Sequence, residues 1–277
     1  MTYRMIACDI DGTLLNNEAR FTDRTLTTLR RCIHRGITVA LVTGRRLRSS
    51  TEVARMIGRD LPIVANDGAV VLAPDGTIIH SNTFDPDRAL GIAEACLSAG
   101  HSVFLHRFTL EGPDVYYKLY PGFTPAQTYI RMVGADAEAL QQLPRALPFR
   151  PLKISTMGDK DSLEALQARL ELEDASTITF DMYAKTYWLQ AVPPGCDKGA
   201  GLKILARHLQ IAPRDIVAFG DNYNDLPMFE VAGTAVAMSN ASDDIKAKAD
   251  VIALSNESDG VARYLDDRVL SSPPEVP

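Results

Sequence analysis

The sequence has few features of a secreted, zinc-binding or nucleic-acid-binding protein. Its four cysteines, Cys8, Cys32, Cys96 and Cys196, lie far apart and lack Cys-x-x-Cys or Cys/His spacing, which argues against a zinc site and a disulfide framework. The formal net charge is -6 and the basic residues are scattered, so we expect no nucleic-acid partner. No segment approaches the roughly 20 apolar residues of a membrane span, so we expect neither a membrane partner nor a cleaved signal peptide. These absences favour a cytoplasmic protein with reduced thiols.

The chain is long enough, at 277 residues with 46% hydrophobic residues, to bury a sizeable core and to form two domains. Residues 3–10 form a short apolar run, as in a central parallel strand. A helical pattern over 23–35 follows, with Thr22 as the expected N-cap and Gly36 as the stop, and then an apolar strand at 37–42. This order predicts a βαβ unit.

Further elements extend this pattern at both ends of the chain. We expect a helix over 47–57, a strand at 62–65, a hairpin of 69–72 with 77–80, a helix over 202–209, and strands at 216–219, 234–237 and 251–253. The middle differs, with helices over 86–98, 124–132 and 162–172 among strands at 102–106, 153–157, 178–182 and 187–191. The sequence therefore predicts a doubly wound, parallel-sheet α/β core (Rossmann-like) of residues 1–83 and 193–277, with an inserted α+β domain of residues 84–192. Residues 271–277 lack apolar periodicity and are expected to form a disordered tail.

Two acids follow the first predicted strand. Asp9 and Asp11 are two residues apart, so both carboxylates lie on one side if the chain stays extended, and Gly12 lets the backbone turn closely past a ligand. Adjacent carboxylates repel one another unless a cation or proton intervenes, which suggests a hard divalent metal. The alternative is an ordinary solvated loop.

Two further groups have the chemistry of a phosphate site. Thr43, Gly44 and Arg45 follow the second strand, where a hydroxyl and backbone N–H groups suit a phosphoryl oxygen, although Thr43 could simply cap a helix. Lys198 opens a helical pattern, where the helix dipole disfavours a cation. Either Asp197 pairs with this lysine, or a bound phosphate satisfies both the lysine and the helix end.

The last group follows the strand at 216–219. Asp221, Asn224 and Asp225 supply two carboxylates and a carboxamide at another strand end, and Asp225 has the alternative role of a helix N-cap. Ligands of open parallel sheets collect beyond the carboxyl ends of the strands, so we expect these groups to converge.

Together, the four groups resemble, in order, the signature motifs of the haloacid dehalogenase (HAD) superfamily: Asp9-Ile10-Asp11-Gly12-Thr13, Thr43-Gly44-Arg45, Lys198, and the segment from Gly220 to Asp225. The insertion and the segment 255–261 resemble the Cof-like branch with its large α/β cap (subfamily IIB type). The resemblance implies a Mg²⁺-dependent phosphatase of a small phosphorylated metabolite, such as a sugar phosphate, acting through an aspartyl-phosphate on Asp9.

The same resemblance implies roles for individual residues. Asp11 would be the general acid and base, and magnesium would be held by Asp9, Asp221 and the backbone carbonyl of Asp11, with Asp225 supporting them. Thr43, Lys198 and Asn224 would hold the phosphoryl oxygens, beside Gly12 and Gly44. Arg45 is a further candidate for an anionic substrate, although a surface role is open.

One run departs from the family pattern. The branch commonly has Asn-Gly-Ala after its third strand, and here the run is Asn66-Asp67-Gly68-Ala69, so either Asn66 takes that role one position early or Asp67 replaces it. Three other functions stay open: a phosphomutase of the same superfamily, a phosphate-receiving signalling module, and a non-catalytic metabolite-binding protein. The identity of the substrate and the oligomeric state are not readable from the sequence.

Overall fold

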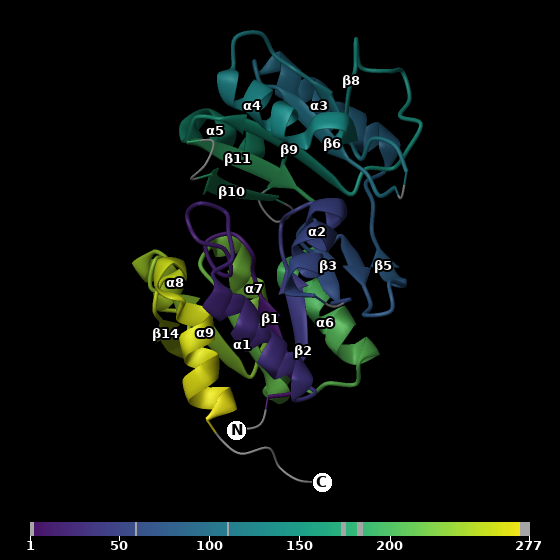
Figure 1. Cartoon of the computed structure of the whole chain (residues 1–277). Coiled ribbons are helices and arrows are strands. Elements are labelled where there is room, and N and C mark those ends of the chain that lie inside the picture. Colours follow the sequence, from purple (N-terminus) through teal and green to yellow (C-terminus); the bar gives the residue numbers. More distant parts are fainter. Residues whose placement is uncertain (1–2, 59, 110, 173–175, 182–184, 272–277) are drawn as a thin grey trace. The chain divides into compact units, whose positions relative to one another are not determined.

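The computed structural model describes residues 3–58, 60–109, 111–172, 176–181 and 185–271 (Figure 1). The chain divides into two compact units, which we call the core unit (Met1–Ser81 with Asp197–Pro277) and the inserted unit (Asn82–Cys196). The predicted boundaries were 84 and 192. The predicted disordered tail falls almost entirely on residues 272–277, which lie outside the described residues, as does the end of the predicted strand at 178–182.

The core unit is built on one eight-stranded sheet in the order β14-β13-β12-β1-β2-β3-β4-β5. The strands from β14 to β3 pair in parallel, and β4 and β5 extend the sheet as an antiparallel hairpin. The strands are β1 (Met5–Cys8), β2 (Thr38–Val42), β3 (Ile63–Ala65), β4 (Val70–Leu72), β5 (Ile78–Ser81), β12 (Ile216–Gly220), β13 (Thr234–Met238) and β14 (Val251–Ala253). The predicted doubly wound α/β fold is confirmed.

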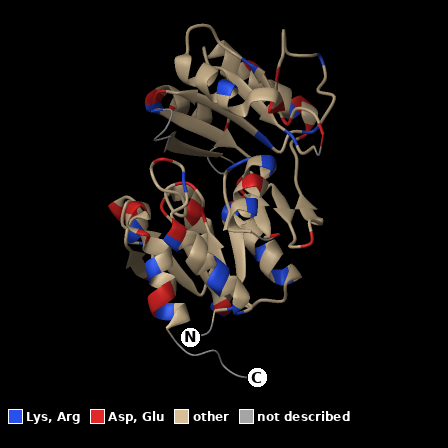
Figure 2. Cartoon of the chain, in the orientation of Figure 1, with Lys and Arg blue, Asp and Glu red and all other residues tan. Residues whose placement is uncertain are grey.

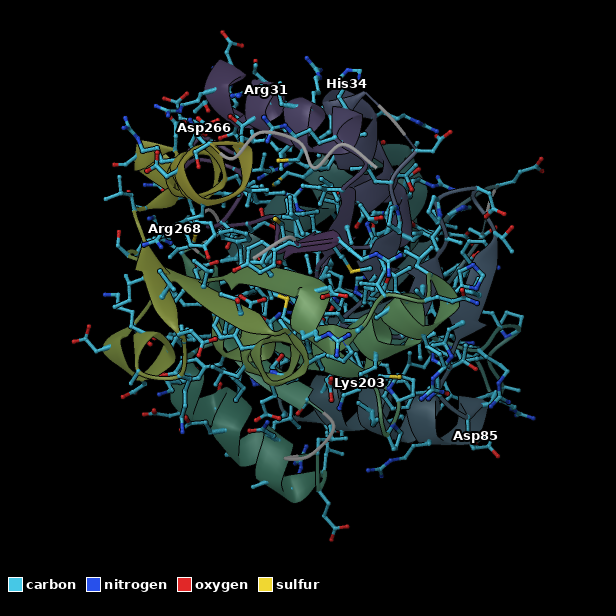
Figure 3. The ribbon with its side chains drawn as sticks, turned by 90° about the horizontal axis from the view of Figure 1, so that it is seen from below. Arg31, His34, Asp85, Lys203, Asp266 and Arg268 are labelled. Carbon is cyan, nitrogen blue, oxygen red and sulfur yellow. The ribbon has the colours of Figure 1, made fainter. Side chains whose placement is uncertain are left out.

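Helices cover both faces of this sheet. Figures 1 and 3 show α1, α2 and α9 on one face and α6 and α7 on the other. The helices are α1 (Asp23–His34), α2 (Leu47–Ile57), α6 (Lys198–His208), α7 (Leu226–Val231), α8 (Asp243–Lys246) and α9 (Gly260–Leu265). All four residues of β1 are buried, which explains why this strand is an uninterrupted apolar run.

Local sequence explains where the first helix begins. The Thr22 hydroxyl accepts a hydrogen bond from the backbone N–H of Thr25, which makes Thr22 the N-cap as predicted. Acidic and basic positions are interspersed on the helices of the core unit (Figure 2). One such pair joins α1 to the chain after α9, because Arg31 lies 2.8 Å from Asp266 (Figure 3).

The inserted unit has its own six-stranded sheet, in the order β10-β11-β9-β6-β7-β8. Its strands are β6 (Val103–His106), β7 (Val115–Lys118), β8 (Ala137–Ala139), β9 (Lys153–Gly158), β10 (Ser176–Asp181) and β11 (Thr186–Ala191), and its helices are α3 (Pro86–Ser98), α4 (Thr124–Val133) and α5 (Lys160–Arg169). Alternate residues of β6 enter two different apolar clusters. Val103 packs with residues of α3 and α5, whereas Phe104 packs with residues of α4.

Two strands of the inserted unit, β7 and β8, were not predicted. Both lie in a stretch without clear alternation of apolar and polar residues. Within the described residues, no helix is both long and apolar enough to cross a membrane.

Candidate active site

The candidate site lies at the carboxyl edge of the core sheet. Asp9, Thr43 and Asp221 follow β1, β2 and β12, and Asn66 and Asp67 follow β3, so the groups come from four neighbouring strands in the order β12-β1-β2-β3. The chain passes from β1 to β2 and β3 on one side and returns through β12 on the other. Such a point, where the strand order reverses, is where open α/β sheets bind ligands.

Lys198 connects two of the acids. It is the first residue of α6 and only 1% exposed, and its ammonium donates to Asp9 Oδ1 at 2.8 Å and to Asp225 Oδ1 at 2.6 Å. The alternative in which Lys198 pairs with Asp197 is wrong. Asp197 is instead the N-cap of α6, where its carboxylate accepts from the backbone N–H of Ala200. The helix also begins four residues before the predicted start at 202, because the periodic apolar residues begin later than the cap.

Asp225 is fully buried and fixes the backbone beside it. Its Oδ2 accepts from the backbone N–H groups of Asp221 and Asn222, each at 2.9 Å, while Oδ1 accepts from Lys198. The carboxylate therefore makes three hydrogen bonds and does not cap α7 through its side chain. The predicted position of Asp225 as a support behind the metal ligands fits these contacts.

Asp221 is oriented by the loop after β1. The Thr13 hydroxyl donates to Asp221 Oδ1 at 2.9 Å. A Cβ added at Gly12 would lie 2.3 Å from Asp221 Oδ2, and Gly12 has φ +76°, so both space and backbone conformation require glycine here. Gly12 thus allows the Asp221 carboxylate to lie against the backbone that follows Asp9.

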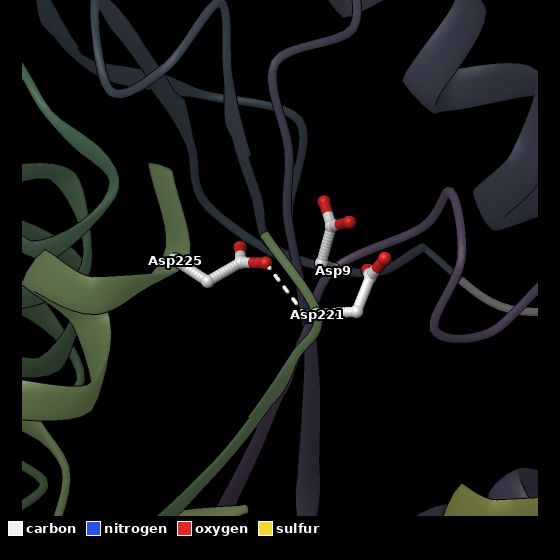
Figure 4. Close-up of side chains that lie close together, drawn as sticks. All are labelled: Asp9, Asp221 and Asp225. Atoms are coloured by element: carbon white, nitrogen blue, oxygen red, sulfur yellow. Dashed lines mark hydrogen bonds between the residues drawn. The ribbon is translucent and has the colours of Figure 1, made fainter. Parts of the chain in front are cut away.

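Three carboxylates form a cluster that could hold a metal. Asp9, Asp221 and Asp225 each present an oxygen, and these atoms lie within 4.8 Å of one another (Figure 4). Because Asp225 is fully buried and its carboxylate already accepts three hydrogen bonds, Asp9 and Asp221 are the better direct ligands. Carboxylate oxygens at this spacing match the hard ligands that Mg²⁺ prefers, so the residues fit the predicted cation.

The electrostatics of the cluster agree with this fit. Burial raises the pKa of Asp9 well above its ordinary value, against the opposing effect of Lys198. Burial and the charge of Asp225 raise the pKa of Asp221 to about 7. Burial lowers the pKa of Lys198, but the surrounding acids outweigh it and the net shift is upward. The ionised acids therefore repel one another, and a divalent cation would relieve that repulsion.

Asp11 has a different partner from Asp9, although only one residue separates them. Arg45 holds the Asp11 carboxylate with two hydrogen bonds, Nε to Oδ2 at 2.7 Å and Nη2 to Oδ1 at 2.5 Å. Such a two-pronged pair fixes both side chains in one plane. Asp11 and Arg45 are both partly exposed, so water screens their attraction.

Thr43 is buried directly after β2. Its hydroxyl accepts from the backbone N–H of Arg45 at 3.1 Å, and its own N–H donates to the carbonyl of Val64 in β3. The alternative role of a helix N-cap is wrong, since that position of α2 belongs to Arg46. Gly44 follows in the predicted phosphate loop.

In the run Asn66-Asp67-Gly68-Ala69, which departs from the family pattern, Asp67 contacts the predicted phosphate-binding residues. Its Oδ1 accepts from Asn224 Nδ2 at 2.9 Å, and a Cβ added at Gly44 would lie 2.9 Å from the same oxygen. Asn66 is buried, and its backbone N–H donates to the carbonyl of Arg45. The structure thus brings Asp67 next to Gly44 and Asn224.

Three residues of the site had no predicted role. Besides Thr13, Asn240 donates to the carbonyl of Gly12 at 2.9 Å, and Asn256 donates to the carbonyl of Leu15 at 2.9 Å. The backbone N–H of Asn256 in turn donates to Asn240 Oδ1 at 3.2 Å. These contacts join distant segments, so the signals were the presence of Thr13 in the family-like run that begins at Asp9 and of Asn256 in the segment 255–261.

The fold and this site define a hydrolase of the haloacid dehalogenase type. A sequence model described as haloacid dehalogenase-like hydrolase matches residues 6–265, and the chain therefore belongs to this family. A solved structure of a haloacid dehalogenase-like hydrolase from B. subtilis superposes with a TM-score of 0.80 at 26% identity, covering 96% of this chain and 99% of the other. The predicted family and enzyme class are confirmed at this level.

Curated relatives agree. An HMP-PP phosphatase of Enterobacter sp. (strain 638) is 30% identical over 86% of this chain and 85% of its own length, and phosphatase YwpJ of Bacillus subtilis is 29% identical over 95% and 98%. The chain is also 28% identical, over 94% of its length, to the chloroplastic endoribonuclease YBEY of Arabidopsis thaliana, but it spans only 45% of that protein.

Proposed function

We propose that this chain is a magnesium-dependent phosphatase that hydrolyses a small phosphorylated metabolite through an aspartyl-phosphate on Asp9. The observation that carries the proposal is the convergence of Asp9, Lys198, Asp221 and Asp225 at one edge of the parallel sheet. Three carboxyl groups against one ammonium leave an excess of negative charge at a mostly buried site, and a bound cation would stabilise that excess.

In the first half-reaction, an oxygen of Asp9 attacks phosphorus, and the bond between phosphorus and the leaving oxygen breaks. Asp11 gives its proton to that leaving oxygen. In the second half-reaction, Asp11 takes a proton from a water molecule that attacks phosphorus, which releases inorganic phosphate and restores Asp9. Covalent catalysis of this kind divides one difficult step into two.

The remaining residues position these groups. Lys198 holds one oxygen of Asp9 and leaves the other to attack, and together with Thr43 and Asn224 it would hold the phosphoryl oxygens. Magnesium would be held by the carboxylates of Asp9 and Asp221 and by the backbone carbonyl of Asp11. When bound, the cation lets an anionic nucleophile approach an anionic substrate.

Asp11 cannot act while Arg45 holds both of its oxygens. The pair must open before Asp11 reaches the leaving group, and an anionic group of the substrate is a natural competitor for the guanidinium. This gives Arg45 a role in admitting anionic substrates.

The substrate class is part of the same proposal. We propose a sugar phosphate, and the HMP-PP phosphatase relative adds HMP-PP to the compounds that deserve a test. Because the core residues grip only the phosphoryl group, we propose that residues 84–192 act as the cap and supply the contacts that select the leaving group.

The test of the mechanism is Asp9→Asn. This change keeps the shape of the side chain but removes the nucleophilic charge, so hydrolysis of p-nitrophenyl phosphate in Mg²⁺ should become nearly undetectable. Asp23→Asn, in the first turn of α1, serves as the control with the same charge change and should retain wild-type activity. Wild-type rates from Asp9→Asn, or from enzyme treated with EDTA, would contradict the proposal.

A phosphomutase of the same family would share the first half-reaction. Release of inorganic phosphate from a sugar phosphate, without an added bisphosphate, supports the phosphatase. A receiver module or a binding protein would release none.

We also propose that the protein works in the cytoplasm. All four cysteines are buried thiols outside any disulfide, as expected for a protein that functions in a reducing compartment.

A further inference from the structure

Asp67 lies in an unusual stretch of backbone directly after β3. Asn66, Asp67 and Gly68 have φ values of +51°, +51° and +89°, so three consecutive residues adopt the left-handed conformation. Asn, Asp and Gly tolerate this conformation better than other residues. At Gly68 no side chain fits, because a Cβ would lie 2.0 Å from the carbonyl oxygen of Asp197. The backbone is therefore held in place at the position of Asp67.

This backbone directs an acidic side chain toward the residues proposed to bind phosphate. Asp67 is 5% exposed, and its Oδ1 lies 2.9 Å from Asn224 Nδ2. The same carboxylate lies against Gly44, where an added Cβ would be 2.9 Å from Oδ1, and its backbone N–H donates to the carbonyl of Thr43. Its negative charge also acts on the Lys198 ammonium.

We propose that Asp67 is a positioning residue that orients the Asn224 carboxamide and whose negative charge limits how tightly the site holds inorganic phosphate. The inference rests on the proposed phosphatase function. A phosphate group that contacts Gly44, Asn224 and Lys198 meets the Asp67 carboxylate as a neighbour of the same sign, and like charges repel in a poorly solvated site. The repulsion weakens the binding of both the substrate and the phosphate product, and the weaker binding of the product favours its release.

The test is Asp67→Asn, studied as the full-length enzyme in Mg²⁺. Asparagine has the same size, tolerates φ near +51°, and keeps a carbonyl oxygen that can accept from Asn224. We expect inorganic phosphate to bind about tenfold more tightly, because removing one negative charge beside the bound phosphate changes the binding constant by roughly one order of magnitude. Isothermal titration calorimetry measures the dissociation constant, and competitive inhibition by phosphate measures it independently. KM should fall in parallel, while kcat stays level or decreases. A merely structural defect would weaken binding and would not strengthen it.

Asp75→Asn is the matched control. Asp75 lies in the turn of the β4–β5 hairpin, where its carboxylate accepts from the backbone N–H of Thr77 at 2.9 Å, and asparagine preserves that contact. The net charge changes by the same amount, so phosphate affinity should stay within about twofold of wild type. Asp67→Gly, which also suits a positive φ, is the second variant if Asp67→Asn does not fold.

The outcomes are distinguishable. Tighter phosphate binding in Asp67→Asn or Asp67→Gly supports the inference, and unchanged or weaker binding in an otherwise active enzyme overturns it. A wild-type protein that neither hydrolyses phosphate esters nor binds phosphate would overturn the proposed function, and this inference with it.

Discussion

Asp225 offers a decisive test of the buried charge network. Replacing it with asparagine keeps the size of the side chain but places an NH₂ group where one of its two oxygens was. In one orientation the NH₂ faces the Lys198 ammonium, and in the other it faces the backbone N–H groups of Asp221 and Asn222. Either way, donors meet donors, and Lys198 retains Asp9 as its carboxylate partner.

The expected cost follows from these contacts. Removing one partner from a buried ion pair costs about 3–5 kcal/mol when the remaining charge is left without a partner, and since Lys198 keeps Asp9, this figure is an upper limit for the ion pair alone. Each hydrogen bond to a charged group contributes about 1.5–3 kcal/mol, so losing one or two of the three gives a similar figure. We therefore expect Asp225→Asn to lower the free energy of unfolding of the core unit by about 3–5 kcal/mol.

Asp197→Asn is the matched control, because Asp197 caps α6 with a single hydrogen bond to the backbone N–H of Ala200. Asparagine caps helices about as well as aspartate, so this change should cost a few tenths of a kcal/mol. Urea unfolding followed by far-UV circular dichroism measures both variants. Trp188, the single tryptophan, lies in the inserted unit, so its fluorescence follows that unit separately. Equal and small losses in the two variants would mean that Asp225 is only a helix-capping residue.

Three further predictions concern the proposed metal site. Burial raises the pKa of Asp9, and that of Asp221 from 3.8 to about 7, so the metal-free folded state binds protons more tightly than the unfolded chain. Stability without metal should therefore fall as pH rises from about 4 to about 7. Thermal unfolding midpoints measured at pH 5 and pH 8 should show this loss of stability in EDTA but much less of it in Mg²⁺. If Asp221→Asn lost as much stability as the wild type between these pH values, the raised pKa of Asp221 would not be a cause of the loss. Gly12→Ala should weaken Mg²⁺ binding at least tenfold by calorimetry, because the added Cβ would clash with Asp221 Oδ2 and a steric cost of about 1.4 kcal/mol already changes a binding constant tenfold. Gly36→Ala, with φ +79° but open space around its Cβ, should leave Mg²⁺ affinity unchanged, and equal effects would refute the steric argument. Asn240→Ala removes the hydrogen bond to the Gly12 carbonyl and should weaken Mg²⁺ binding about threefold to tenfold; wild-type affinity would exclude a positioning role.

The site residues that could be predicted from the sequence are those that directly follow a parallel strand. Asp9, Thr43 and Asp221 each follow an apolar strand, and parallel strands present their carboxyl ends at one edge. Their convergence could therefore be predicted without coordinates. The doubly wound sheet itself could be predicted for the same reason, because short apolar runs alternate with helical patterns at both ends of the chain.

The partners of these groups could not be predicted in the same way. Asp197 was a reasonable partner for Lys198 because it is adjacent in sequence, yet the ammonium reaches Asp9 and Asp225 instead. Asn240 contacts Gly12 across 228 positions of the chain, and no local pattern records such a pairing. Side-chain partners depend on tertiary packing, which the periodicity of a sequence does not contain.

The charges of the site also explain why its acids belong together. Asp9, Asp67 and Asp225 act on the Lys198 ammonium, and so does Asp221. Four carboxylates around one ammonium leave an excess of negative charge in a largely buried place, and a phosphate dianion would add to it. A pair of acids after a strand could be a solvated loop, but this excess of charge in a mostly buried set is the physical reason for our proposal that a cation accompanies the anionic ligand. The same excess makes the extra acid at Asp67 consequential, since its removal should strengthen the binding of phosphate to the cation-loaded site.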